Sequence, residues 1–307
     1  MASRTPTPEL GTVRTDDGHA ISYASYGSGA STVVLVHGIT LDRRIWAPQV
    51  RDLTDAGHRV VTIDQRGHGE SSPLNAAVDP TRLGADIACV LEALDLHDVT
   101  LVGHSLGGIA SLTFVVDHTD MARERLHGLV LLSTTGTARF ASHVTSMHAI
   151  VAPVERLAYK VVPRWIPTPV RVAVKPKTIG RGVLRFAFGR KPDSTDVAVT
   201  EHMFSHTAHS TVRHLFSGLL DWHLLDDLDE VDVPTLVVCG SRDLITPLPL
   251  SRHLHKRLQG SELFEVPGAG HMLMMERPEL LADLISDFAE RPAATEAPHG
   301  LRAVDAG

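Results

Sequence analysis

Six short runs of consecutive apolar and β-branched residues recur along the chain, and stretches with helical spacing of apolar residues separate them. The runs are continuous rather than alternating, which is the pattern of strands that are covered on both faces. Strands that alternate with helices predict a mostly parallel, doubly wound sheet of the α/β class. Ligands of such sheets bind beyond the carboxyl ends of the strands. The predicted strands are Thr32–Val36, Arg59–Ile63, Val99–Val102, Leu129–Leu132, Thr235–Val238 and Glu262–Val266.

The predicted helices of this core carry recognisable start signals. Asp79-Pro80 precedes one helix, and a proline stands in the first turn of two others. Before the first run, residues 9–27 predict a hairpin that turns at Asp16-Asp17-Gly18. We expect a core formed by residues 9–136 and 229–290, a flexible tail at 1–8 and a disordered tail at 291–307. The helices are predicted at Trp46–Asp55, Thr81–Leu94, Leu106–His118, Pro247–Leu258 and Pro278–Ala289.

The alternation of strands and helices stops between residues 137 and 228. This segment has no convincing buried strand and is rich in proline. It is also basic, because residues 137–197 contain eleven Lys or Arg but three Asp or Glu, in a chain whose net charge is −7. We therefore predict a helical cap, inserted after the sixth strand if the hairpin is counted. Its helices are expected at Thr145–Val162, Thr178–Phe188, Asp196–His206 and Thr211–Leu225.

A candidate nucleophile lies directly after the run Val99–Val102, in the G-x-S-x-G pentapeptide from Gly103 to Gly107. Small residues on both sides of Ser105 allow a sharp turn from strand to helix, which exposes the serine hydroxyl at the tip of the turn. The pattern alone is weak evidence, because G-x-S-x-G also occurs by chance. Its meaning therefore depends on whether the chain supplies partners for Ser105.

Two such partners follow later strands. A serine needs a base to take its proton, and the base needs a carboxylate to hold its tautomer. Asp243 follows the run Thr235–Val238, and His271 follows the run Glu262–Val266. Both are therefore expected at the sheet edge of Ser105, in the order Ser, Asp, His. His104 cannot readily fold back onto its neighbour Ser105, so we expect it to have a packing role.

The developing oxyanion of an acyl-transfer reaction needs hydrogen-bond donors. Leu106, the residue after the nucleophile, offers one backbone N–H. His37-Gly38 follows the run Thr32–Val36, and a glycine there lets the backbone approach the site. We therefore expect the N–H of Ile39 to be the second donor.

These residues together resemble the α/β-hydrolase family, over roughly residues 10–290 apart from the insertion. The resemblance rests on His37-Gly38, the stretch Asp64–Ser71, the Ser105 turn, Asp243 and His271. It implies a lid or cap at the insertion and a supporting role for Asp64–Ser71 beside the oxyanion loop. It also implies two-step acyl transfer. Family members that act on epoxides or haloalkanes use aspartate where this chain has Ser105, which argues against both activities.

The leading prediction for function is a serine esterase or lipase that acts on an apolar carboxylic ester. Thioesterases, C–C bond hydrolases and cofactor-free perhydrolases, sometimes called haloperoxidases, use the same three residues, so they remain alternatives. A different class is a small-molecule receptor that binds without catalysis. The three residues need no cofactor, and we expect none.

Composition excludes some other classes. The negative net charge disfavours nucleic-acid binding. No run is long enough to span a membrane and no signal peptide is recognisable, so a cytoplasmic location is expected. Cys89 and Cys239 are interpreted as buried thiols. His202, His206 and His209 could share a helix face, but no suitably spaced acid or cysteine completes a metal site, so we expect no metal.

The cap leaves the substrate open. Its basic and aliphatic residues fit a lid that meets an anionic membrane, recognition of an acidic substrate, or a solvated helical face that balances the acidic core. We also predict an apolar acyl pocket between cap and core. Its lining is expected to include Trp165, Phe186, Phe188, Met203, Phe204 and Trp222.

Overall fold

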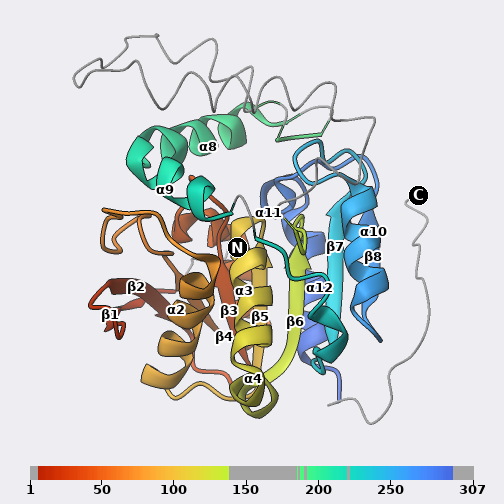
Figure 1. The fold of residues 1–307 in the computed structure, drawn as a ribbon. Coiled ribbons are helices and arrows are strands. Elements are labelled where there is room, and N and C mark those ends of the chain that lie inside the picture. The colour runs from red at the N-terminus through yellow and green to blue at the C-terminus, as the bar shows by residue number, and fades with distance from the viewer. Residues whose placement is uncertain (1–5, 138–184, 186, 190–191, 220–221, 293–307) are drawn as a thin grey trace.

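A computed structural model of the chain describes residues 6–137, 185, 187–189, 192–219 and 222–292. Its centre is an eight-stranded sheet with the strand order β1-β2-β4-β3-β5-β6-β7-β8 (Figure 1). Strands β1 and β2 form the predicted hairpin and pair antiparallel, and the other six strands run parallel to one another. The strands are β1 (Glu9–Arg14), β2 (Ala20–Tyr26), β3 (Thr32–Val36), β4 (Arg59–Ile63), β5 (Val99–His104), β6 (Leu126–Leu132), β7 (Thr235–Gly240) and β8 (Glu262–Val266).

Strand β3 shows why the apolar runs are continuous. All five of its residues are buried. Val34 and Val36 belong to the apolar cluster on one face of the sheet, and Val33 and Leu35 belong to the cluster on the other face. Successive side chains of a strand point to opposite faces of the sheet. Because helices cover both faces here, every position of the strand carries an apolar residue. The predicted doubly wound α/β sheet is confirmed.

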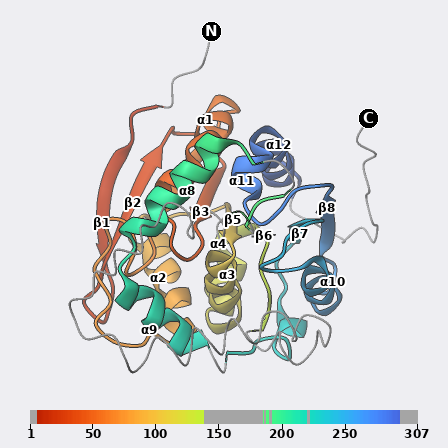
Figure 2. The ribbon, with the colours of Figure 1, turned by 90° about the horizontal axis from the view of Figure 1, so that it is seen from above.

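Helices cover both faces of the sheet. Helices α1, α11 and α12 lie together on one face, and α2, α3 and α10 lie on the other (Figure 2). Asp79 caps the start of α2 by accepting the N–H of Thr81 at 3.0 Å, and Pro80 occupies the first position. The core helices are α1 (Ala47–Asp55), α2 (Pro80–Ala93), α3 (Leu106–Asp117), α4 (Thr119–Arg125), α10 (Leu248–Arg257), α11 (Leu273–Glu276) and α12 (Pro278–Ala289).

The chain changes direction across the sheet at β3. It passes from β3 to β4 on one side and then returns through α2 to β5 on the other side, where Val36 pairs with Gly103. The segments that leave β3 and β5 therefore start side by side at the carboxyl edge of the sheet. This is the kind of position at which open α/β sheets bind their ligands.

Two described helices of the insertion, α8 (Ser194–His206) and α9 (His209–Leu219), lie above this edge (Figure 1). Helix α9 is attached to the core, because Thr211 Oγ1 donates to the carbonyl of Gly67 at 3.2 Å. The carbonyl of His214 accepts the N–H of Val78 at 3.4 Å. The predicted helix 145–162 and most of the predicted helix 178–188 lie outside the described residues.

The structure corrects several predicted boundaries. Helix α8 starts two residues earlier than predicted, and α9 spans His209–Leu219 in place of the predicted helix 211–225. Leu224 is not helical, since its N–H donates to the carbonyl of Gly136 at 2.9 Å. The predicted helix 106–118 ends at Asp117, and α4 follows as a separate helix, since His118 leaves the helical conformation with φ −124° and ψ 46°. Single-turn elements such as α11 and the 3₁₀ helix η1 (Arg43–Trp46) were not predicted, because one turn is too short for a periodic pattern.

Both cysteines are free thiols, but only Cys239 is fully buried. Cys89 is half-buried at the margin of the cluster under α2, so its interpretation as a buried residue was wrong. In the parts of the chain that the structure describes, no helix is both long and apolar enough to cross a membrane.

Candidate active site

Ser105 occupies the turn between β5 and α3 in a conformation that few residues adopt, with φ 51° and ψ −113°. Its N–H donates to the carbonyl of Leu132 at 2.9 Å, and its carbonyl accepts Thr134 Oγ1 at 2.7 Å. A Cβ atom on Gly107 would lie 2.2 Å from the carbonyl oxygen of Val36, so this position requires glycine. The turn has the sharp, strained geometry that the pentapeptide predicts, and strain of this kind is common at functional sites.

Asp243 and His271 meet at the same edge, although 28 positions separate them in the chain. His271 Nδ1–H donates to Asp243 Oδ2 at 2.9 Å, and both side chains are buried. Burial acts to raise the pKa of Asp243, but the neighbouring His271 and the hydrogen bonds to the carboxylate hold it below its usual value. The proton on Nδ1 leaves Nε2 of His271 as the nitrogen that can accept another proton.

Thr246 also holds the Asp243 carboxylate, and the sequence analysis missed it. Its hydroxyl donates to Asp243 Oδ2 at 2.8 Å and lies 3.2 Å from His271 Nδ1. Its N–H and that of Ile245 both donate to Asp243 Oδ1 at 2.8 Å. Aspartate side chains that accept N–H groups two and three residues ahead form a common local turn, so Asp243-x-x-Thr246 could have been recognised.

His104 connects the Ser105 turn with the His271 loop. Its Nε2–H donates to the backbone carbonyl of His271 at 3.0 Å, and the two imidazole rings lie 4.7 Å apart. Burial, together with the nearby His271, depresses the pKa of His104 well below its usual value, so this ring stays neutral. The predicted packing role is therefore accompanied by a specific hydrogen bond to the residue expected to be the base. The described residues include no hydrogen bond between Ser105 and His271, but His104, the neighbour of Ser105, contacts His271 through this bond and through its ring.

The loop after β3 approaches the serine closely. A Cβ atom on Gly38 would lie 3.2 Å from Ser105 Cβ and 2.8 Å from His104 Nδ1, so a larger residue would push this loop away. Ile39 follows directly, and Leu106 is the first residue of α3, where the N–H has no acceptor within the helix. The positive end of the helix dipole at Leu106 also favours a negative charge there.

His37 links this loop to the next strand. It is fully buried; its Nδ1–H donates to the carbonyl of Gly38 at 2.7 Å, and its Nε2 accepts the N–H of Gln65 at 3.1 Å. Burial lowers the pKa of His37. Although Nε2 also lies 4.0 Å from Asp64 Oδ1, it serves as an acceptor, so the two side chains do not form an ion pair.

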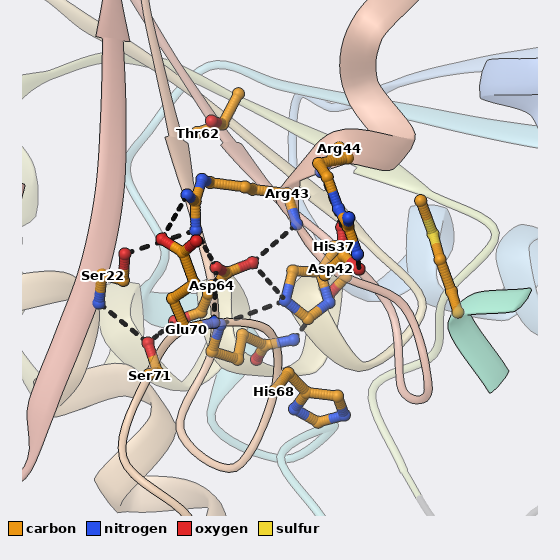
Figure 3. Close-up of polar contacts among 12 residues, drawn as sticks. Ser22, His37, Asp42, Arg43, Arg44, Thr62, Asp64, His68, Glu70 and Ser71 are labelled. Carbon is orange, nitrogen blue, oxygen red and sulfur yellow. Dashed lines mark hydrogen bonds and ion pairs between the residues drawn. The ribbon is translucent and has the colours of Figure 1, made fainter. Parts of the chain in front are cut away.

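Asp64 organises the stretch Asp64–Ser71 that the family resemblance singled out (Figure 3). Its carboxylate accepts the backbone N–H of Arg43 at 2.7 Å and that of Glu70 at 3.0 Å, and it pairs with the guanidinium of Arg43. The same guanidinium reaches Glu70 at 2.6 Å. Ser71 ties the stretch to β2, because its hydroxyl donates to the Asp64 carbonyl and accepts the N–H of Ser22. These contacts fit a supporting role for the stretch.

His68, within the same stretch, supports the loop after β3 directly. Its Nε2 accepts the N–H of Thr40 at 3.2 Å. Thr40 has a positive φ of 62°, a conformation that threonine rarely adopts without support. Burial and the neighbouring His37 lower the pKa of His68 to about 3, which keeps Nε2 free to accept this hydrogen bond.

The other predicted residues fall in separate places. The rings of His202 and His206 on α8 lie 4.0 Å apart between centroids and are tilted by 41°. In the described ranges no three His, Cys, Asp or Glu side chains are arranged to hold a metal. Phe188 and Met203 are buried in the cluster under α1 and α12, Trp222 is buried in the opposite cluster, and Phe204 is 45% exposed. Trp165 and Phe186 lie outside the described residues, so the acyl pocket stays a prediction.

Known proteins share this architecture. The non-heme chloroperoxidase CPO-A1 of Kitasatospora aureofaciens is 30% identical over 280 residues, which cover 85% of this chain and 92% of that protein. The esterase EaEST of Exiguobacterium antarcticum is 22% identical and superimposes with a TM-score of 0.75 over 91% of this chain and 99% of that one. Est816, described as an N-acyl homoserine lactone degrading enzyme, is 27% identical with a TM-score of 0.69 over 91% of this chain and 100% of its own.

The family model for the alpha/beta hydrolase fold matches residues 31–278, which include the loop after β3, the Ser105 turn, Asp243 and His271. This match spans most of the chain, as does the alignment with the 30% identical relative. The chain therefore belongs to the alpha/beta hydrolase fold family.

Proposed function

We propose that this protein is a serine hydrolase that cleaves a carboxylic ester through an acyl-enzyme on Ser105. The observation that carries the proposal is the hydrogen bond from His271 Nδ1 to the buried carboxylate of Asp243, at the sheet edge where Ser105 sits in its strained turn. This bond fixes the tautomer in which Nε2 can act as a base. A buried acid whose carboxylate is held by two backbone N–H groups and a hydroxyl suits such a role.

The reaction would proceed in two similar halves. His271 Nε2 takes the proton of Ser105 Oγ as that oxygen attacks the ester carbonyl carbon, and the N–H groups of Ile39 and Leu106 stabilise the oxyanion. His271 then gives the proton to the leaving alkoxide, and the alcohol departs. A water molecule attacks the acyl-enzyme with His271 again as base, which releases the acid and restores Ser105.

The relatives favour one second candidate. The 30% identical relative is named a non-heme chloroperoxidase, so an acyl-enzyme that is released by hydrogen peroxide rather than by water is the alternative with specific support. Est816, whose described substrates contain a lactone ester, supports ordinary ester hydrolysis. Thioester and C–C bond cleavage would use the same residues, and a receptor without catalysis would retain the fold but not the turnover.

The test combines turnover with labelling of the serine. A series of p-nitrophenyl esters of increasing acyl length is assayed with and without hydrogen peroxide, beside a vinylogous diketone and a thioester. We expect ester hydrolysis, and labelling of the protein by a fluorophosphonate probe. Both should be lost in Ser105→Ala.

Ser133→Ala is the matched control, because Ser133 directly follows the neighbouring strand β6, as Ser105 follows β5, and also has a positive φ, of 44°. It should keep both turnover and labelling. A wild-type protein that binds esters but neither turns them over nor reacts with the probe would favour the receptor. Preferential oxidation in the presence of peroxide would favour the perhydrolase.

The apolar character of the substrate and the membrane contact of the cap are part of the proposal. Reversing several basic charges between residues 137 and 197 should weaken turnover on anionic liposomes while leaving turnover of a soluble short-chain ester unchanged. Equal turnover on anionic and neutral liposomes in both proteins would contradict a lid that meets anionic lipid.

A further inference from the structure

Glu276, at the end of α11, bridges two backbone segments beside His271. Its Oε1 accepts the N–H of Gly270 at 2.8 Å, and its Oε2 accepts the N–H of Gly189 at 2.7 Å. Gly270 immediately precedes His271, whereas Gly189 belongs to the predicted cap. One half-buried carboxylate therefore joins the loop of the proposed base to a segment more than 80 positions earlier in the chain.

The cap segment Ala187–Gly189 lies directly on the His271 loop. The carbonyl of Ala187 accepts the backbone N–H of His271 at 2.7 Å and that of Met272 at 3.2 Å. A Cβ atom on Gly189 would lie 2.3 Å from the carbonyl oxygen of Gly268, so the two backbones are in direct contact. The backbone of His271 is thus held by the cap segment at its N–H and by His104 at its carbonyl.

The core side of this bridge is firmly anchored. Gln49 on α1 donates through Nε2 to the carbonyl of Met274 at 3.0 Å and to that of Pro278 at 3.3 Å, which fixes α11 from below. Gln49 and Met274 are fully buried. If the bridge is broken, we therefore expect the change to fall on the cap segment and on the Gly270–His271 backbone rather than on α11.

We propose that Glu276 is a positioning residue that clips the cap segment Ala187–Gly189 to the His271 loop, so that the geometry of the proposed base depends on the cap. The proposal rests on the proposed function, because its effect on turnover requires His271 to act as the base. A carboxylate can accept both N–H groups at once. Glutamine at position 276 has a single acceptor oxygen. The N–H of either Gly189 or Gly270 would then face the NH₂ group of the glutamine side chain.

The experiment compares graded changes at Glu276 with a change on the other side of the clip. For the p-nitrophenyl ester that the wild type turns over best, we expect kcat to fall about 10-fold in Glu276→Gln and about 100-fold in Glu276→Ala, with KM changed much less. Gly189→Ala should lower kcat as well, because the new methyl group would lie 2.3 Å from the Gly268 oxygen and 2.8 Å from Glu276 Oε2. The exposed Glu279, three positions further on, provides the control Glu279→Gln, which should match the wild type.

A double-mutant cycle shows whether the Glu276 and Gly189 variants lose activity through the same contact or through two independent defects. Because both changes break the same contact, Glu276→Ala combined with Gly189→Ala should lose little more kcat than Glu276→Ala alone. Two losses that multiply would overturn the proposal. It would also be overturned if Glu276→Gln and Glu276→Ala lowered the melting temperature but kept the wild-type kcat.

Amide hydrogen exchange tests the clip independently of turnover. We expect the N–H groups of Gly189, Gly270 and His271 to exchange faster in Glu276→Ala than in the wild type, while the low-field proton signal of His271 Nδ1–H broadens or shifts. Unchanged exchange would contradict the clip even if kcat fell. If the wild type cleaves no ester but the exchange rates change as expected, the clip stands and the proposed function fails.

Discussion

The two halves of the candidate site are built differently. On the oxyanion side, the side chains that hydrogen-bond the loop after β3 are those of His37, His68 and Asp64, and all three belong to the core. Helix α9 touches this side at Gly67, whose carbonyl accepts Thr211 Oγ1. On the base side, Asp243 is held by its own turn, but the backbone of His271 depends on His104 and on the cap segment Ala187–Gly189. The loop after β3 is thus hydrogen-bonded by core side chains, whereas the backbone of His271 itself is hydrogen-bonded by the cap segment.

This difference suggests a division of labour. A preorganised oxyanion loop stabilises charge without rearranging during the reaction, which is the basis of this kind of catalysis. If the proposed clip holds, a change in the segment Ala187–Gly189 would instead reach the backbone of His271. Changes on the base side should therefore alter turnover, whereas changes on the oxyanion side should first alter stability.

Asp243→Asn should produce the largest effect. Its side-chain amide would donate toward His271 Nδ1 and favour the tautomer that cannot accept the serine proton, so kcat should fall about 10⁴-fold in a folded protein. Kinetics with a short-chain ester, compared with the exposed control Asp283→Asn, would measure this. A loss smaller than about 10-fold would mean that another group orients His271.

His104→Phe should have the next largest effect. The phenyl ring keeps the packing but leaves the buried carbonyl of His271 without its donor, so kcat should fall by about 10- to 100-fold. His104→Gln restores a donor and should recover most of this loss. If both variants lost the same activity, the imidazole would be needed for its shape and not for its hydrogen bond.

Thr246→Val should weaken turnover by only about 5-fold, because it removes one hydrogen bond to a carboxylate that keeps three others. Thr246→Ser keeps the hydroxyl and should resemble the wild type. The pH dependence of kcat/KM in these two variants measures whether the hydroxyl also influences His271. Equal kcat in the valine and serine variants would mean that the Thr246 hydroxyl does not support the Asp243–His271 pair.

On the oxyanion side, we expect His68 to make the free energy of unfolding depend on pH. The pKa of His68 is about 3 in the folded protein, whereas an unfolded chain titrates near 6.5. Below about pH 6.5 the unfolded state therefore binds a proton that the folded state does not, so the free energy of unfolding falls as the pH decreases toward 3. At pH 5.5 this loss is about 1.4 kcal/mol.

His68→Gln should flatten this dependence, as measured by urea unfolding between pH 5 and pH 8. The half-exposed His97 supplies the control His97→Gln, which should retain the wild-type slope. The buried His37 and His104 also have lowered pKa values, so part of the slope will remain in His68→Gln. An unchanged slope in this variant would show that His68 is protonated in the folded protein.

The sequence predicted the sheet and the positions of Ser105, Asp243 and His271 at its edge, because apolar periodicity and strand ends are local features. It assigned a supporting role to the stretch with His68 but did not predict the bond from Thr40 to His68, which forms only when two loops meet. It also missed Thr246, although that contact with Asp243 is a local turn. The bridge from Glu276 to Gly189 joins residues 87 positions apart and has no periodic signal. Single-turn elements such as α11 were also not predicted, because one turn is too short to give a periodic pattern.

The most direct test of the central claim is a crystal structure of the protein after reaction with a p-nitrophenyl phosphonate. We predict phosphorus bonded to Ser105 Oγ, one phosphonyl oxygen within hydrogen-bond distance of the N–H groups of Ile39 and Leu106, and His271 Nε2 facing Ser105. Phosphorus on another residue, or a phosphonyl oxygen directed away from both N–H groups, would contradict the proposed site.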